Sequence, residues 1–233
     1  MIPGKTIVVI PTYNERENIS DLINRIFEVD NDLIVLFVDD NSPDGTSGLI
    51  ENIAKYDKRI YLIKKEKEGI ALAYVRGFEK ALEMDPEHII QMDADLSHNP
   101  AHIPEMLKQA ESFDVVIGSR YISGGSSCLR GLFRPCISII GAGLTRFMLG
   151  VKIRDVLGGY KCFKTVVLKN INFNKIRSRG FFFQAEMNYL LGRRGCRFKE
   201  IPIVFLKRNK GKSKFSLGMI WEAMALILFL RVN

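Results

Sequence analysis

The chain has 233 residues, 47% of them hydrophobic, which is long enough for one large α/β domain and short for two. Its four cysteines are far apart and form no Cys-x-x-Cys pair, so neither a zinc knuckle nor a disulfide framework is indicated, and a reducing cytosol suits them. The net charge is +8, and residues 116–233 carry 22 basic but only 4 acidic side chains, so this half is expected to face an anionic partner.

The first half alternates apolar segments of strand length with amphipathic segments of helix length. It starts without the regions of a secretory signal. The expected strands are Thr6–Ile10, Leu33–Val38, Arg59–Ile63, His88–Met92 and Asp114–Gly118. This alternation predicts a parallel sheet covered by helices. Ligands of such sheets bind beyond the carboxyl ends of the strands, so the loops that follow these strands are expected to form one rim.

The second half is less regular. We expect helices over Arg134–Leu149 and Phe183–Arg194 and strands over Gly158–Phe163 and Arg197–Leu206. Pro202 places the last of these strands near a sheet edge. The apolar segment Leu217–Leu230 predicts a terminal helix about 21 Å long, which is too short to cross a hydrocarbon core of ~30 Å.

The motif Asp93-Ala94-Asp95 directly follows the fourth strand. If the chain stays extended there, both carboxylates project to the same side. Two such oxygen ligands can hold Mg²⁺ or Mn²⁺ against the phosphates of a substrate, where the ion neutralises charge on a departing diphosphate. The alternative is an acidic turn that caps the helix expected near Asn99.

The loop after the first strand, residues 11–18, offers an aromatic ring and carboxylates. Tyr13 can stack on a nucleobase, and Glu15 can accept hydrogen bonds from a purine. An equally open interpretation makes Asn14 and the glutamates caps of the following helix.

The second rim loop begins with the adjacent carboxylates Asp39 and Asp40. Because adjacent like charges are costly, one of them is expected to meet a ligand or a donor, while Asp44 can equally be a helix cap. Further on, residues 67–73 resemble a glycine turn that opens a helix toward phosphates, although they match neither known glycine-rich phosphate motif.

Seven segments resemble the family 2 glycosyltransferases in order and spacing, with the dolichol-phosphate mannose synthases as the nearest group. They are VVIPTYNEREN, FVDDNSPDGT, QMDADLSHNP, VIGSRY, RDVLGGYKCF, GFFFQAEM and FLKRNKGKSKF. The resemblance covers nearly the whole chain. It implies a GT-A-type, Rossmann-like and mostly parallel sheet, GDP-mannose as donor, dolichyl phosphate or another polyprenyl phosphate as acceptor, and transfer with inversion.

The resemblance also implies roles for individual residues. The donor nucleotide would contact Pro11, Tyr13, Glu15, Asp39, Asp40, Asp93 and Ala94. The metal, Mg²⁺ or Mn²⁺, would be held by Asp93 and Asp95. The acceptor phosphate would contact Arg120, Arg134, Ser138, Arg208 and Lys214. Catalysis would rest on Asp95, Arg120 and Arg208.

The chain departs from the family pattern at three places. Ser97 stands where many relatives have Gln, which leaves the third metal ligand open. Lys212 and Ser213 stand where relatives read Gly-Glu-Ser-Lys, so an acidic residue is replaced by a basic one. Arg134 and Ser138 fit the Arg-x-x-x-Ser spacing of relatives, but aligning the following Gly-Ala pair shifts them by one residue.

We therefore expect a catalytic domain over residues 1–214 and an amphipathic helix over 215–233. That helix, preceded by the basic run Lys207–Lys214, is expected at a membrane interface or on a small transmembrane anchoring subunit, with core packing as the alternative. The expected location is the cytoplasmic face of a membrane, as a peripheral protein, in the endoplasmic reticulum of a eukaryote or the plasma membrane of a prokaryote.

Other functions are weighed against this one. A different donor such as UDP-glucose is the first alternative, and a non-catalytic, membrane-recruited protein that binds nucleotide sugars is the second. A sugar nucleotidylyltransferase would need a glycine-rich, Arg-containing loop after the first strand. Nucleic acid is not expected as a partner, because no aromatic residues are interleaved with the basic run Lys207–Lys214.

Overall fold

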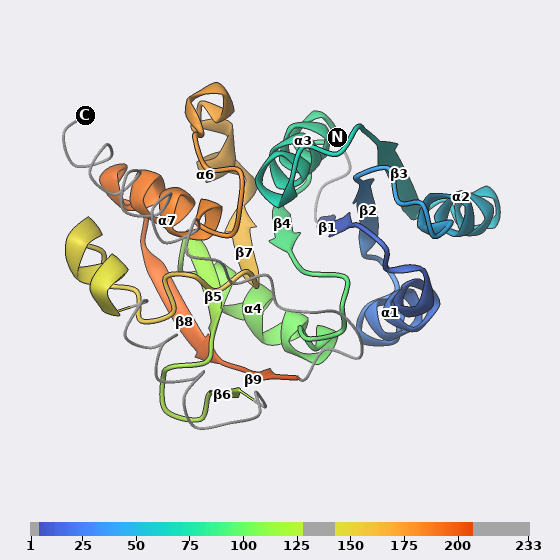
Figure 1. The fold of residues 1–233 in the computed structure, drawn as a ribbon. Coiled ribbons are helices and arrows are strands. Elements are labelled where there is room, and N and C mark those ends of the chain that lie inside the picture. The colour runs from blue at the N-terminus through green and yellow to red at the C-terminus, as the bar shows by residue number, and fades with distance from the viewer. Residues whose placement is uncertain (1–4, 128–142, 207–233) are drawn as a thin grey trace.

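The computed structural model describes residues 5–127 and 143–206, which form a sheet with helices on both faces (Figure 1). The strands are β1 Thr6–Thr12, β2 Ile34–Asp39, β3 Ile60–Lys64, β4 His88–Gln91, β5 Val115–Ser119, β6 Ser126–Ser127, β7 Lys161–Lys164, β8 Phe198–Pro202 and β9 Val204–Phe205. The helices are α1 Arg16–Val29, α2 Thr46–Tyr56, α3 Ile70–Glu83, α4 Ile103–Ala110, α6 Thr165–Lys169 and α7 Phe183–Arg193, with 3₁₀ turns at Pro100–His102 and Phe173–Lys175. Residues 143–149 are also helical.

The main sheet has seven strands in the order β3-β2-β1-β4-β7-β5-β8. All neighbours run parallel except β7, which is antiparallel to both β4 and β5. The prediction of a mostly parallel sheet is thus confirmed, and the five expected strands of the first half agree to within one or two residues.

The second half differs from expectation in two places. The strand expected over Arg197–Leu206 is two strands, β8 and β9, which belong to different sheets. The break follows Pro202, which has no N–H to donate, and β8 is the edge strand that this proline predicted. The strand expected from Gly158 starts only at Lys161, because the chain first turns at Asp155–Gly158, where the Gly158 N–H binds the Asp155 carbonyl.

Two apolar layers cover the faces of the sheet. Val8 and Ile10 of β1 pack with α1, α2 and α4, whereas Ile7 and Val9 pack with α3, α6 and α7. Both faces of the central strands are therefore buried, which explains their continuous apolar sequences. A Cβ on Gly77 of α3 would lie 2.3 Å from a methyl group of Val9, so this glycine lets α3 approach β1 closely.

No helix within the described residues is long and apolar enough to cross a membrane. Most of the expected helix Arg134–Leu149, the domain boundary at residue 214 and the terminal helix at 215–233 lie outside the described residues.

Candidate active site

The loops after β1 and β2 are joined by hydrogen bonds at the carboxyl ends of these strands. The Asn14 amide donates to Ser42 Oγ at 3.0 Å, and the Glu15 amide donates to Thr46 Oγ1 at 3.1 Å. Asp44 accepts from the Arg16 amide, so the starts of α1 and α2 are tied together. The expected convergence of these two loops on one rim is confirmed.

Asp39 and Asp40 are both buried and both meet protein donors, as expected for adjacent carboxylates. Asp39 accepts hydrogen bonds from the Ser42 amide and from the hydroxyls of Thr12, Ser42 and Ser47, at 2.5–2.8 Å. Burial alone would raise the pKa of Asp39, but these hydrogen bonds outweigh it and hold the pKa below its usual range. Asp40 accepts from Lys65 Nζ at 2.7 Å and from the Gly69 amide at 3.2 Å.

The remaining residues expected at the nucleotide lie on the same rim. Pro11 is part of β1, and Lys67 Nζ lies 3.6 Å from the centroid of the Tyr13 ring, so a cation already covers one face of this ring. Glu15 occupies the N-cap position of α1, but its side chain caps no backbone N–H and accepts instead from Asn18 at 2.6 Å.

The chain does not stay extended through Asp93-Ala94-Asp95. It leaves β4 at Gln91, bends at residues 94–96, and Leu96 has a φ of 62°. The condition on which two carboxylates were expected to project to the same side is therefore not met, because the backbone bends at this motif. The capping alternative is wrong as well, since Asn99 caps the following 3₁₀ turn by accepting from the Ala101 amide.

Asp93 is held in place by residues from two directions. Its Oδ1 accepts from the hydroxyl of the fully buried Tyr74 at 2.7 Å, and its amide donates to His98 Nδ1 at 3.1 Å. Burial lowers the pKa of His98, and a ring nitrogen that accepts an amide proton belongs to a neutral imidazole. His98 Nε2 lies 4.0 Å from Asp93 Oδ2, beyond hydrogen-bond distance.

Asp95 is turned inward. It is 7% exposed, and its Oδ1 accepts from the amide and the hydroxyl of Ser97 at 3.0 and 2.5 Å. Ala94 between the two aspartates packs into the apolar layer. Ser97, at the position of the third metal ligand left open by the sequence, therefore uses its hydroxyl on Asp95.

The residues present fit a metal that is shared with a substrate. Within residues 5–127 and 143–206, no group of three or more His, Cys, Asp or Glu side chains could hold an ion alone. In proteins, Mg²⁺ is usually bound by one or two carboxylates, and phosphates of the substrate complete its coordination. Asp93 Oδ2 suits this role, because no donor among the described residues lies within hydrogen-bond distance of it.

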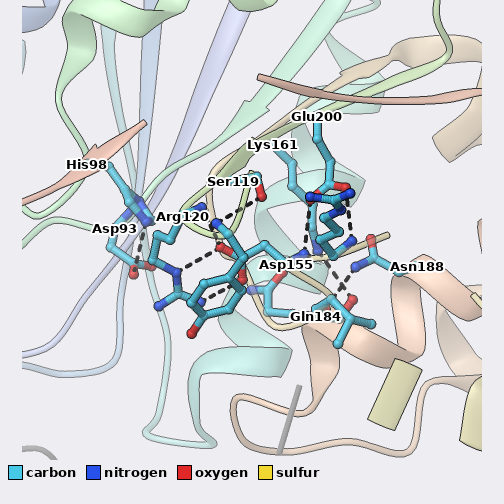
Figure 2. Close-up of polar contacts among 12 residues, drawn as sticks. Asp93, His98, Ser119, Arg120, Asp155, Lys161, Gln184, Asn188 and Glu200 are labelled. Carbon is cyan, nitrogen blue, oxygen red and sulfur yellow. Dashed lines mark hydrogen bonds and ion pairs between the residues drawn. The ribbon is translucent and has the colours of Figure 1, made fainter. Parts of the chain in front are cut away.

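Asp93 and Arg120 line the same pocket, which has a volume of about 80 Å³. Arg120 follows β5 and makes two side-chain hydrogen bonds to the fully buried Asp155, from Nε at 2.8 Å and from Nη2 at 2.7 Å (Figure 2). Glu200 of β8 in turn accepts from the amides of Arg154 and Asp155. These contacts fix Arg120 beside the pocket. Its Nη1 forms no hydrogen bond with any of the described residues.

Comparison with known proteins shows the family of the chain. The sequence profile described as "Glycosyl transferase family 2" matches residues 7–171. The chain belongs to this family. It is therefore a glycosyltransferase.

Two curated relatives of this glycosyltransferase are similar over most of its length. One is named undecaprenyl-phosphate mannosyltransferase, from Micrococcus luteus, and is 36% identical over 94% of this chain and 91% of its own. The other is named polyprenol monophosphomannose synthase, from Mycolicibacterium smegmatis, and is 36% identical over 94% of this chain and 84% of its own.

Solved structures share the fold of the glycosyltransferase at low sequence identity. Glucosyl-3-phosphoglycerate synthase from Mycobacterium tuberculosis, solved with Mn²⁺, UDP-glucose and phosphoglyceric acid, has a TM-score of 0.69 and 16% identity, covering 97% of this chain and 79% of that one. TarS from S. aureus, solved with UDP-GlcNAc, has a TM-score of 0.64 and 20% identity, covering 98% of this chain and 67% of that one. The expected GT-A-like fold is confirmed.

The structure brings some of the predicted site residues of the glycosyltransferase together and leaves others untested. Asp93 and Arg120 share a pocket, whereas Asp95, two residues after Asp93, does not line it. The predicted acceptor-phosphate residues Arg134, Ser138, Arg208 and Lys214 lie outside the described residues, so their roles stay predictions.

Sequence reasoning missed the polar residues that support the site. Tyr74, Asp155, Lys161 and Gln184 were given no role, although the last three stand in segments that resemble the family. The available signal was Lys161, the one charged residue of the expected strand Gly158–Phe163. Lys161 is fully buried, and its Nζ donates to Gln184 Oε1 at 2.7 Å and to the Gln184 carbonyl at 3.3 Å.

We expect Lys161 to make the stability of the glycosyltransferase depend on pH. Burial lowers the pKa of Lys161 to about 7, against the opposing charge of Asp155, whereas an unfolded lysine titrates near ~10.4. Between these values the unfolded chain binds more protons, so the free energy of unfolding should rise with pH. Urea unfolding of wild type and Lys161→Met between pH 7 and pH 10 should show this rise in wild type only.

The exposed Lys169, paired with Asp85, supplies the control for this experiment. Lys169→Met should follow the wild-type pH dependence. Parallel pH profiles of wild type and Lys161→Met would show that Lys161 titrates as an ordinary lysine.

Proposed function

We propose that the chain transfers mannose from GDP-mannose to a polyprenyl phosphate such as dolichyl phosphate, with inversion at the anomeric carbon and with Mg²⁺ or Mn²⁺ at Asp93 and Asp95. The observation that carries this proposal is the 36% identity, over 94% of the chain, to proteins named for mannose transfer to polyprenyl phosphates. The shared pocket of Asp93 and Arg120 supports it, because it sets an anionic group beside a cationic one.

In this mechanism, the carboxylates of Asp93 and Asp95 lie next to the donor diphosphate and would hold the metal ion there. A divalent cation held there would neutralise the charge that develops on the departing nucleoside diphosphate, as the fold neighbour solved with Mn²⁺ and UDP-glucose suggests. Asp93 is oriented for this task by Tyr74 and His98, so little reorganisation is needed when the donor binds.

Arg120 acts on the acceptor phosphate. A phosphate monoester has a second pKa near ~6, so its oxygen is already an anion at neutral pH and needs no catalytic base. Arg120, held rigidly by Asp155, would orient this oxygen toward the anomeric carbon. The new carbon–oxygen bond forms as the bond to the diphosphate oxygen breaks on the opposite side, which inverts the configuration.

The proposal includes a membrane location. We propose that the protein acts as a peripheral protein at the cytoplasmic face, where a polyprenyl phosphate is presented, and that residues 207–233 contact the membrane or an anchoring subunit. Arg208 and Lys214 would then lie near the acceptor phosphate. Co-sedimentation with vesicles that contain anionic lipid, compared with neutral vesicles, tests the membrane contact.

The donor is tested by offering GDP-mannose and UDP-glucose in parallel, each with dolichyl or undecaprenyl phosphate and with Mg²⁺, Mn²⁺ or EDTA. The expected result is a polyprenyl phosphate mannose, formed only from GDP-mannose and only with a divalent cation. Product from UDP-glucose alone would favour the alternative donor. UDP-glucose is included because two fold neighbours were solved with UDP sugars. Metal-dependent nucleotide binding without any product would favour the non-catalytic alternative.

A further inference from the structure

Gln184, in the first turn of α7, presents one half of its side-chain amide to the pocket of Asp93 and Arg120. The residue is 3% exposed and lines this pocket. Its Oε1 accepts from Lys161 Nζ at 2.7 Å (Figure 2) and from Gln91 Nε2 at 2.8 Å. Both of these partners donate to the same oxygen, so together they determine which end of the amide faces inward. The Nε2 end must face the other way.

The Nε2 group has no hydrogen-bond acceptor among the described residues. The group borders the pocket, where water can reach it, so a substrate that displaces this water loses affinity unless it supplies an acceptor. The other half of the same amide has two donors, so the side chain is fixed rather than free to rotate toward a partner elsewhere. An acceptor on a bound substrate would satisfy this group.

Gly159 shows where such an acceptor fits. A Cβ added to this glycine would lie 3.6 Å from Gln184 Nε2, 3.7 Å from Asp93 Oδ2 and 3.5 Å from His98 Cε1. The amide and the carboxylate therefore border the same small space, which stays open because residue 159 has no side chain. These distances are ordinary van der Waals contacts, so an alanine would fit there but would fill the space.

The chemistry of this space matches a sugar hydroxyl. A hydroxyl can accept from an amide N–H and donate to a carboxylate at the same time, which is what Gln184 and Asp93 offer. A phosphate oxygen has no proton to give to Asp93 and would approach this carboxylate only through the metal, and the cationic group suited to direct contact with phosphate in this pocket is Arg120. The nucleobase is expected to bind at a different part of the rim, where Tyr13 lies.

We propose that Gln184 Nε2 donates a hydrogen bond to a hydroxyl of the transferred sugar, and that Gly159 keeps the space for this hydroxyl open. This inference rests on the proposed function, because it takes the same pocket as the donor site. Gln184 is thereby a residue that contacts the sugar part of the donor, and Lys161 and Gln91 are positioning residues that hold its amide.

The test compares nucleotide sugars with the matching nucleoside diphosphates. Gln184→Glu keeps an oxygen for Lys161 and Gln91 but removes the donor that faces the pocket. With Mn²⁺ present, calorimetry should show that the affinity for GDP-mannose falls about tenfold, which corresponds to ~1.4 kcal/mol, while the affinity for GDP changes less than about twofold. UDP-glucose and UDP form a second pair, so that the result does not depend on the identity of the donor.

A second variant, Gly159→Ala, repeats the test if Gln184→Glu folds poorly, and a third, Asn188→Ala, is the control. Gly159→Ala fills the space from the opposite side and should lower the affinity for the sugar nucleotide but not for the diphosphate. Asn188→Ala removes another buried amide of α7, which binds the Val156 carbonyl and does not line the pocket, and should leave the ratio of the two affinities unchanged.

Equal losses for the sugar nucleotide and the diphosphate in both variants, or no loss in either, would overturn the inference. So would a wild-type protein in which the sugar adds nothing to the affinity. Failure of the proposed function looks different, since the sugar-dependent binding would then be intact while no sugar reaches a polyprenyl phosphate.

Discussion

Asp93→Asn is expected to lower the rate of sugar transfer by about a hundredfold to a thousandfold without unfolding the protein. Asparagine can still accept the Tyr74 hydroxyl hydrogen bond through its carbonyl oxygen, so the packing around the site is kept. What is lost is the negative charge on the oxygen that faces the pocket. Steady-state transfer rates over a range of Mn²⁺ concentrations should show the loss, together with a weaker dependence on the metal.

A second aspartate provides the control for this prediction. Asp85 is paired with Lys169 on the surface, away from the pocket, and Asp85→Asn should leave both activity and metal dependence unchanged.

Asp95→Ala should also abolish turnover while the protein stays folded. Full activity in Asp93→Asn would mean that the acidic motif does not serve the donor diphosphate, and full activity in Asp95→Ala would remove Asp95 from the metal site.

Arg120→Met is expected to affect stability and activity together. It leaves Asp155, which is 0% exposed, as an unpaired buried charge, and breaking such a pair costs about 3–5 kcal/mol. In the proposed function it also removes the cation that orients the acceptor phosphate. Urea denaturation should report the first effect, and transfer assays under conditions where the variant is still folded should report the second.

The double variant Arg120→Met/Asp155→Asn separates these two effects. Asparagine removes the buried charge and can still accept the Arg120 backbone N–H, since this hydrogen bond needs only an oxygen at position 155. We expect most of the lost stability to return while activity stays low. If activity returned with stability, Arg120 would be a structural residue, and its assignment to the acceptor phosphate would be wrong.

The sheet of the first half could be predicted from sequence because its strands are buried on both faces. Continuous apolar segments such as Ile34–Val38 have no other simple explanation, and their order along the chain implies parallel pairing. The position of β7 could not be predicted. Periodicity reports whether a segment is a strand, but it carries no information about which distant strand it pairs with.

The site was predictable to a similar degree. Asp93 stands in a motif whose residue types already suggest metal binding, and Arg120 stands in a segment whose resemblance to the family implies a phosphate contact. Asp155, Lys161 and Gln184 have roles that depend on partners far along the chain, as when Gln91 donates to Gln184, 93 residues away. No local pattern marks such contacts, so the supporting half of the pocket became visible only in three dimensions.

The antiparallel strand β7 also sets the span of the active site. Asp93 follows β4 and Arg120 follows β5, and β7 lies between these two strands. Neighbouring strands are about 4.8 Å apart, so the intervening strand places β4 and β5 about 10 Å from each other. If β4 and β5 were direct neighbours, the acidic and basic groups would be close enough to neutralise each other. In the proposed function, the inserted strand acts as a spacer that leaves room for the reacting sugar between the donor diphosphate and the acceptor phosphate.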